Sequence, residues 1–280
     1  MKRGVRLGVA LGGGGARGLA HLGVLMELAR AGVRPEFVAG TSMGAIVGAA
    51  YAVGQDLSKL LRVLEHLELA KVFGVPETYD RVVGQTLAES LWERLRQKAW
   101  WEESSPRLSR LLEFLKLLTK GVWFEDLDIP FIAVAADLAT GEEVQIDEGP
   151  VHLGVAASAA LPGVFGPVQW RKRYLVDGGL VNNLPVAAVE TLGARTVLAV
   201  DVAAPLGPLP KTLVGVALRA QEVTARELGR VKLDHARGRL GQRLMVIHPE
   251  VDEIGLLEFD RIEEAVEAGR IAARSALSFL

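Results

Sequence analysis

The chain has 280 residues, a formal net charge of −2 and no cysteine. Half of its residues are hydrophobic and 24% are charged, a composition that excludes a disordered or collagen-like chain. The near-neutral charge provides no basic field for nucleic acid. The missing cysteines exclude a disulfide framework, a thiolate metal site and a cysteine nucleophile.

The first fifty residues alternate short apolar runs with helical segments. Residues 6–11 form an apolar run that ends at the glycines of residues 12–15, and residues 19–31 have helical periodicity. A second apolar run over residues 37–40 precedes a small-residue helix predicted over residues 45–53. This order predicts the start of a parallel α/β sheet.

The glycine-rich segment after the first strand permits three interpretations. A P-loop requires a Gly-Lys-Ser/Thr ending, which the segment lacks. A dinucleotide loop requires an acid at the end of the second strand, and that strand ends without one. In the third interpretation, the backbone amides of Gly13, Gly14 and Gly15 converge on a substrate oxygen. Arg17 would then supply a cation for a phosphate or carboxylate, and we favour this interpretation.

The sequence Gly40-Thr41-Ser42-Met43-Gly44 stands between the second apolar run and the following helix. A Gly-x-Ser-x-Gly at this position is typical of a nucleophile elbow, where the serine occupies a strained turn and the glycines let strand and helix pass closely. The N-terminus of the helix directs amide groups and a partial positive charge toward an oxyanion. The motif predicts Ser42 as a nucleophile.

Between about residues 56 and 120 the alternation of strands and helices stops. The region is Leu-rich, charged and helical, and it contains Trp92, Trp100 and Trp101. A helix is predicted from about residue 106. Its apolar stripe comprises Leu108, Leu111, Leu112, Leu115 and Leu118. Two interpretations stay open: an insertion that packs on the sheet, or a cap whose Trp/Leu face makes transient contact with a membrane surface.

The alternation resumes after residue 130. Further strands are predicted at residues 131–136, 143–146, 174–176, 196–202 and 244–248, and a helix over residues 259–277. Two uncharged stretches, 37–55 and 151–170, contain glycines or prolines and favour a buried strand–turn–helix over a membrane span. The glycine run also interrupts any signal peptide, so we expect a cytoplasmic protein with at most peripheral membrane contact.

A serine nucleophile needs a base, and two candidates end predicted strands. His248 completes the chain order Ser…Asp…His of α/β-hydrolase triads. Asp177 also ends a strand, and the two glycines behind it allow its carboxylate to approach another loop. Of the other histidines, His66 and His235 are expected to be solvated. His21 is expected to pack or to support the glycine loop.

Four motifs in this order resemble those of the patatin-like phospholipases. They are Gly13-Gly14-Gly15-Ala16-Arg17-Gly18, Gly40-Thr41-Ser42-Met43-Gly44, Ala157-Ser158-Ala159-Ala160-Leu161-Pro162 and Asp177-Gly178-Gly179. The resemblance covers about residues 5–200, with a family-like helix after residue 259. It implies a three-layer α/β/α patatin-like fold with a mainly parallel central sheet and a helical insertion.

The same resemblance implies a serine–aspartate dyad that hydrolyses lipid acyl esters without a histidine. Ser42 matches the nucleophile and Asp177 matches the base. Burial should raise the pKa of this aspartate. Gly13–Gly15 match the oxyanion loop, and Arg17 matches its basic position. The resemblance implies no cofactor and no metal. The expected substrates are phospholipids or lysophospholipids; the preferred ester and the oligomeric state stay open.

The chain is expected to form a single domain over residues 1–280, with core motifs at about 5–200, the insertion at about 56–120 and C-terminal helices at about 213–280. The alternatives are a Ser42–Asp–His248 triad esterase, a non-catalytic binding protein on a hydrolase scaffold, and a nicotinamide oxidoreductase. Asn182-Asn183 predicts a turn, with a second role in steadying the catalytic loop. Ser158 is predicted to begin a buried helix and is given no catalytic role.

Overall fold

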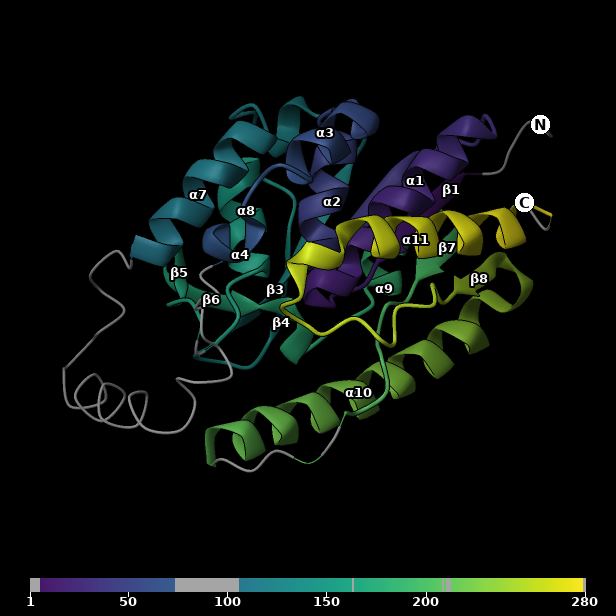
Figure 1. Ribbon diagram of the computed structural model, residues 1–280. Coiled ribbons are helices and arrows are strands. Elements are labelled where there is room, and N and C mark those ends of the chain that lie inside the picture. The colour runs from purple at the N-terminus through teal and green to yellow at the C-terminus, as the bar shows by residue number, and fades with distance from the viewer. Residues whose placement is uncertain (1–5, 74–105, 163, 208, 210–212, 279–280) are drawn as a thin grey trace.

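The structure, a computed structural model, describes residues 6–73, 106–162, 164–207, 209 and 213–278 (Figure 1). Within these residues, eight strands form one sheet of order β5-β6-β3-β2-β1-β7-β8, with β4 paired to β3. The strands are β1 (Leu7–Leu11), β2 (Phe37–Thr41), β3 (Phe131–Asp137), β4 (Glu143–Ile146), β5 (Val168–Trp170), β6 (Arg173–Asp177), β7 (Thr196–Val200) and β8 (Leu244–Ile247).

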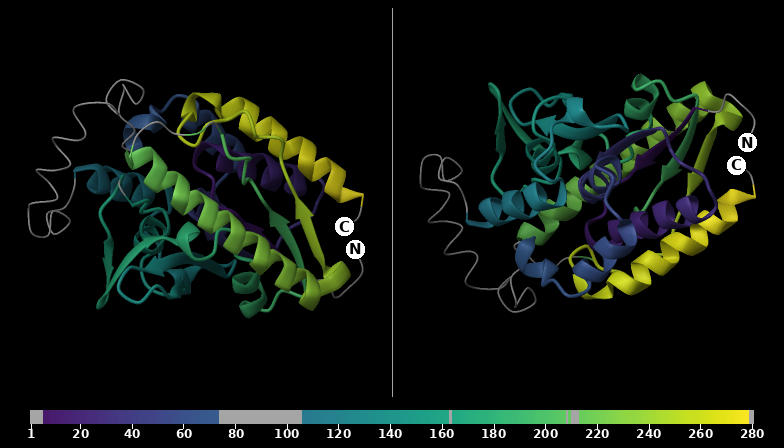
Figure 2. Two further views of the ribbon diagram at one scale, coloured as in Figure 1. Left: turned by 90° about the horizontal axis from the view of Figure 1, so that it is seen from below. Right: turned by 90° about the horizontal axis from the view of Figure 1, so that it is seen from above.

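Helices cover both faces of this sheet (Figure 2). The α-helices are α1 (Ala20–Arg30), α2 (Met43–Ala52), α3 (Leu57–Leu64), α4 (Leu69–Val72), α7 (Pro106–Leu118), α8 (Val151–Ser158), α9 (Val186–Thr191), α10 (Leu213–Leu240) and α11 (Ile262–Leu277). The short 3-10 helices are η1 (Gly15–Leu19), η2 (Phe124–Asp126), η3 (Gly178–Leu180), η4 (Gly241–Arg243) and η5 (Phe259–Arg261). One buried cluster joins the sheet to α1, α2, α8 and α11, and a second joins its other face to α9 and α10. The predicted three-layer α/β/α architecture is confirmed.

The strand pairing brings the predicted motifs together at one end of the sheet. The core strands β8, β7, β1, β2 and β3 run parallel, and β4, β5 and β6 add antiparallel pairings. On one side of β3, Val134 pairs with Thr41 at the end of β2. The next residue of β3, Ala135, pairs with Asp177 at the end of β6. The carboxyl ends of β1, β2 and β6 are therefore neighbours.

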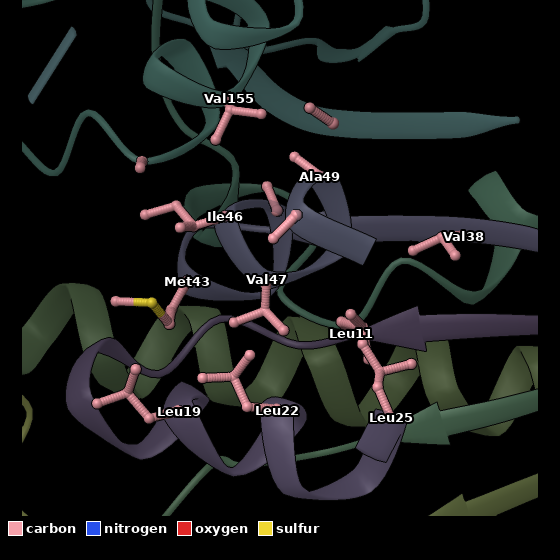
Figure 3. Close-up of a cluster of buried hydrophobic side chains, with 14 of the residues drawn as sticks. Leu11, Leu19, Leu22, Leu25, Val38, Met43, Ile46, Val47, Ala49 and Val155 are labelled. Atoms are coloured by element: carbon pink, nitrogen blue, oxygen red, sulfur yellow. The ribbon is translucent and has the colours of Figure 1, made fainter. Parts of the chain in front are cut away.

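The core between α1, α2 and the sheet explains why the elbow helix is buried. Figure 3 shows Leu22 and Leu25 of α1 on one side of α2 and Val155 of α8 on the other, with Val47 of α2 directed toward α1. These side chains are almost fully buried. Helix α2 consists of small and apolar residues with one tyrosine, so apolar neighbours can surround it. This packing fixes the helix that begins beside Ser42.

Most predicted elements are present, but in one stretch the predicted order of strand and helix was wrong. The predicted strands correspond to β1, β2, β3, β4, β6, β7 and β8, and the helices that flank the glycine loop and the serine correspond to α1 and α2. The stretch 151–170 is helix α8 followed by strand β5, not a strand followed by a helix. Ser158 accordingly ends its helix instead of beginning it. Because most of α8 is buried, its sequence has no polar face from which a helical period could be recognised.

The region of residues 56–120 is described in part. Trp92, Trp100 and Trp101 lie outside the described residues, so the predicted contact with a membrane surface has no structural test there. Helix α7 begins at residue 106 as predicted. Its Leu111 and Leu115 are fully buried, so the predicted apolar stripe of this helix packs against the body of the protein. Within the described part of the chain, no helix has both the length and the apolar content needed to cross a membrane.

Candidate active site

Ser42 occupies a tight turn between β2 and α2. Its backbone has φ 54° and ψ −122°, a conformation that non-glycine residues rarely adopt and that stores roughly 1–3 kcal/mol of strain. Helix α2 starts directly against β1. A Cβ on Gly44 would collide with the carbonyl oxygen of Leu11, so only glycine permits this approach. The segment therefore has the geometry of a nucleophile elbow.

Ser158 supports this turn from behind. The backbone N–H of Ser42 donates to Ser158 Oγ at 3.0 Å, and Ser158 Oγ donates to the carbonyl oxygen of Val134 at 2.6 Å. Ser158 is fully buried at the end of α8, so the two bonds tie the elbow to β3. Sequence reasoning missed this role. The available signal was a single hydroxyl in a helix of small apolar residues, where a buried polar group needs a partner.

Asp177 is the hydrogen-bond partner of the serine. Ser42 Oγ donates to Asp177 Oδ2 at 2.6 Å, and the N–H of Gly179 donates to Asp177 Oδ1 at 2.7 Å. Only 5% of Asp177 is exposed. Burial raises the pKa of Asp177 to about 6, since the loss of hydration disfavours the charge more than the bonds from Ser42 and Gly179 favour it. The site thus joins a serine hydroxyl to a carboxylate of increased basicity.

The glycine loop lies against the serine. A Cβ placed on Gly13 would be 3.2 Å from Ser42 Cβ. The N–H of Gly13 already donates to the carbonyl oxygen of Asn183 at 3.0 Å, so one of the three predicted oxyanion donors is occupied. Among the hydrogen bonds of the described residues, the amides of Gly14 and Gly15 have no acceptor. These two amides are therefore available to a ligand. Gly15 has φ 56°, a left-handed conformation that favours glycine.

Arg17 is held by the segment that follows β8. Its Nε donates to the carbonyl oxygen of Ile254 at 2.7 Å. Burial lowers the pKa of Arg17, while the negative charges of Glu222, Asp252 and Glu258 act in the opposite direction. These three carboxylates partly neutralise the guanidinium. The predicted cation is present beside the glycine loop, and part of its hydrogen-bonding capacity stabilises the protein itself.

His248, the alternative base, lies with another carboxylate. Its Nδ1 is 3.6 Å from Oδ2 of Asp201, and its side chain is 57% exposed. The described residues include all five histidines, and within that set no histidine hydrogen-bonds Ser42. The structure thus pairs Ser42 with Asp177 and His248 with Asp201.

Three of the other histidines, His21, His66 and His235, lie as the sequence indicated. His66 and His235 are exposed. His21 is fully buried, and its Nε2 lies 2.7 Å from the carbonyl oxygen of Gly12, so it supports the glycine loop. Across the part of the chain that the structure describes, no group of three or more His, Asp and Glu side chains is arranged to hold a metal ion.

Comparisons with known proteins identify the family. The model of the family "Patatin-like phospholipase" matches residues 9–189. An uncharacterized NTE family protein of Mycobacterium tuberculosis is 33% identical over 304 residues, which cover 97% of this chain and 46% of that protein. Lysophospholipase NTE1 of Pyricularia oryzae is 28% identical, with 95% of this chain and 18% of that protein covered.

Among solved structures, VipD from Legionella pneumophila is similar with a TM-score of 0.49 and 17% identity, covering 97% of this chain and 66% of that chain. This chain spans less than half the length of the two curated relatives named above. The family model covers more than half of the chain, from β1 to α9. The chain therefore belongs to the patatin-like phospholipase family.

Proposed function

We propose that this protein hydrolyses carboxylic esters of phospholipids or lysophospholipids through an acyl-enzyme formed on Ser42. The observation that carries the proposal is the 2.6 Å hydrogen bond from Ser42 Oγ to the buried carboxylate of Asp177. Family membership and the similarity to a protein named a lysophospholipase support the lipid ester as the substrate class. We place this site in a single patatin-like domain over residues 1–280.

In the first half-reaction, Asp177 accepts the proton of Ser42 Oγ as the oxygen attacks the ester carbonyl. The tetrahedral intermediate carries an oxyanion, to which the amides of Gly14 and Gly15 donate while the Gly13 amide holds the loop. Collapse breaks the ester bond. The alcohol leaves with the proton from Asp177, and the acyl group stays on Ser42.

In the second half-reaction, a water molecule gives its proton to Asp177 and attacks the acyl-enzyme. The second tetrahedral intermediate uses the same amides, and its collapse returns the proton to Ser42 Oγ and releases the fatty acid. Burial assists both steps, because a carboxylate with a pKa of about 6 is a stronger base than an exposed one. The N-terminus of α2 adds partial positive charge near the oxyanion.

The alternatives have less support from the geometry. A triad with His248 would need that imidazole beside the serine, whereas His248 lies next to Asp201. A non-catalytic protein would have no need of a strained serine against a buried carboxylate. Arg17 is proposed to attract an anionic headgroup, a role weakened by its acidic neighbours.

The experiment compares the wild type with Ser42→Ala, Asp177→Asn and His248→Ala on a short-chain p-nitrophenyl ester, a phospholipid and a lysophospholipid. Turnover lost in the first two variants and kept in the third supports the dyad. Turnover lost in folded His248→Ala would replace the dyad by a triad. A wild type that hydrolyses none of the esters, and that an active-site serine probe does not label, would support the non-catalytic alternative.

A further inference from the structure

One peptide group of the glycine loop, between Gly12 and Gly13, is held at both of its polar atoms. Its carbonyl oxygen, on Gly12, lies 2.7 Å from Nε2 of His21. Its N–H, on Gly13, donates to the carbonyl oxygen of Asn183 at 3.0 Å. The side chain of Asn183 returns a bond, since its Nδ2 donates to the carbonyl oxygen of Gly13 at 3.0 Å. The start of the loop is therefore fixed by two residues that the mechanism itself does not use.

The burial of His21 indicates that its imidazole has a role beyond packing. Because the carbonyl oxygen of Gly12 only accepts, Nε2 must carry the proton and donate. The ring is fully buried, and its Nδ1 has no hydrogen-bond partner. An apolar side chain of similar size would fill this space without an unpaired nitrogen. Burial also lowers the pKa of His21 to about 4, so the donating ring is neutral near pH 7.

Asn183 connects the glycine loop to the aspartate. It follows Asp177 by six residues, in the segment that begins with η3. Its Oδ1 lies between the two glycine segments: a Cβ would be 2.5 Å from it on Gly13 and 3.1 Å from it on Gly179. The N–H of Gly179 donates to the Asp177 carboxylate. One side chain thus sets the distance between the loop and the carboxylate.

We propose that His21 and Asn183 are positioning residues for the two open amides of the glycine loop. This inference rests on the proposed function, because those amides have a task only where an oxyanion forms on a carbonyl attacked by the serine. Two hydrogen bonds fix the peptide between Gly12 and Gly13, and the bond from Asn183 Nδ2 to the carbonyl oxygen of Gly13 fixes the next peptide, which carries the N–H of Gly14. Since no protein acceptor among the described residues holds the amides of Gly14 and Gly15 themselves, their direction depends on these two peptides.

Loss of either residue should act on the transition state more than on substrate binding. The oxyanion exists only in the tetrahedral intermediates, so displaced amides lower kcat and leave KM nearly unchanged. A displacement of about 1 Å at a reacting group costs about 10²-fold in rate. We expect a loss of about this size in kcat for each residue.

The test uses full-length protein with two variants at each position. Asn183→Ala removes the side chain, and Asn183→Asp keeps its size but replaces the Nδ2 donor by an oxygen. His21→Met fills the buried space without a donor, whereas His21→Gln restores one. The matched control is Thr119→Val, which removes a buried hydroxyl that donates to the carbonyl oxygen of Leu115 in α7.

Three experiments are made: kcat and KM are measured on a p-nitrophenyl ester, the inhibition constant is measured for an alkyl trifluoromethyl ketone, and amide hydrogen exchange is measured for the peptide that contains residues 12–18. The ketone forms a tetrahedral adduct with an oxyanion, so its affinity reports the amides directly. Asn183→Ala, Asn183→Asp and His21→Met should lose about 10²-fold in kcat and in ketone affinity and exchange faster in that peptide. His21→Gln should recover most of the loss, and Thr119→Val should change thermal stability alone.

Unchanged exchange of the 12–18 peptide in both Asn183→Ala and His21→Met, with kcat within threefold of the wild type, would overturn the inference. A rise in KM at constant kcat would overturn it as well, because the residues would then act on binding. A wild type without ester turnover would remove the proposed function instead, and the exchange comparison would still decide whether His21 and Asn183 hold the loop. Asn183→Asp keeps the test decisive if the buried histidine variants do not fold.

Discussion

The hydroxyl of Thr41 donates to the carbonyl oxygen of Asn182 at 2.8 Å, so the residue before the serine is bonded to the segment that follows the aspartate. Both residues are buried. Nδ2 of Asn182 lies 3.1 Å from each carboxylate oxygen of Glu143, and Lys232 of α10 pairs with Glu143 at 2.7 Å. The spacing between Ser42 and the carboxylate of Asp177 is therefore set by backbone segments that are bonded to each other.

This relationship predicts the effect of Thr41→Val, which keeps the shape of the side chain and removes its donor. The carbonyl oxygen of Asn182 would lose a partner in a buried place, at a cost of about 1–3 kcal/mol in the free energy of unfolding. The elbow would also loosen, and we expect kcat to fall about tenfold. Urea unfolding and ester hydrolysis measure the two effects.

The control for this variant is Thr119→Val, at a hydroxyl that is equally buried and that donates to the carbonyl oxygen of Leu115 in α7. It should lose similar stability and keep the wild-type kcat. Equal kcat in both variants would show that the Thr41 hydroxyl stabilises the fold without positioning the serine.

Asp177→Asn is expected to abolish activity and to stabilise the protein. Burial raises the pKa of Asp177 from 3.8 to about 6, so the ionised side chain destabilises the folded state above that pH by up to about 3 kcal/mol. A neutral amide of the same shape avoids this cost and can still bond to Ser42 and Gly179. Chemical unfolding should give a gain of about 1–3 kcal/mol at pH 8.

The same comparison at pH 4 provides the control. There the wild-type carboxyl of Asp177 is protonated in the folded state, so the two proteins should have nearly the same free energy of unfolding. A variant that is less stable than the wild type at pH 8 would mean that the hydrogen bonds to the carboxylate outweigh its desolvation.

The sequence predicted the parts of the site that depend on local chain geometry. The elbow around Ser42 and the glycine loop each lie between one strand and one helix, and turn residues report such connections directly. The glycines behind Asp177 at a strand end made it a candidate base beside His248, and the resemblance to the patatin-like phospholipases favoured Asp177. The fold class followed from the alternation of strands and helices together with the four ordered motifs.

The contacts between distant segments had no comparable signal. The bonds from Ser158 to the elbow and from Asn183 to Gly13 join residues 116 and 170 positions apart. Nothing in either local sequence specifies such a partner. The occupied amide of Gly13 is a consequence of the same contact. The order of α8 and β5 was wrong for a different reason, since a buried helix shows no polar period.

The pH dependence of hydrolysis should report the base. Because the ionised form of Asp177 accepts the serine proton, kcat/KM should rise with pH and reach half of its plateau near pH 6. His248→Ala should leave this midpoint in place. A midpoint near 7 that disappears in His248→Ala, measured on the same ester, would identify the imidazole as the base.

The stability of the protein should also depend on pH through His21, with the opposite sign to Asp177. Burial lowers the pKa of His21 from 6.5 to about 4, so the unfolded chain binds a proton in this range that the folded protein does not. The contribution of the neutral His21 ring to the free energy of unfolding is therefore fully present above pH 6.5. It is lost as the pH falls toward 4, by up to about 3 kcal/mol. As the pH falls over nearly the same range, protonation of Asp177 stabilises the folded protein. In the wild-type curve, the contributions of His21 and Asp177 therefore oppose each other.

His21→Gln separates them, because the amide keeps a donor for Gly12 and does not titrate. Between pH 7 and pH 4, this variant should become more stable relative to the wild type by about 2–3 kcal/mol, measured by chemical unfolding at each pH. Combined with Asp177→Asn, it should leave the slope that comes from other groups with shifted pKa, among them His152, whose pKa burial lowers, and Glu27, whose pKa Arg30 lowers. Parallel curves for wild type and His21→Gln would mean that the folded protein admits a proton to the imidazole, and that the buried ring is not held neutral.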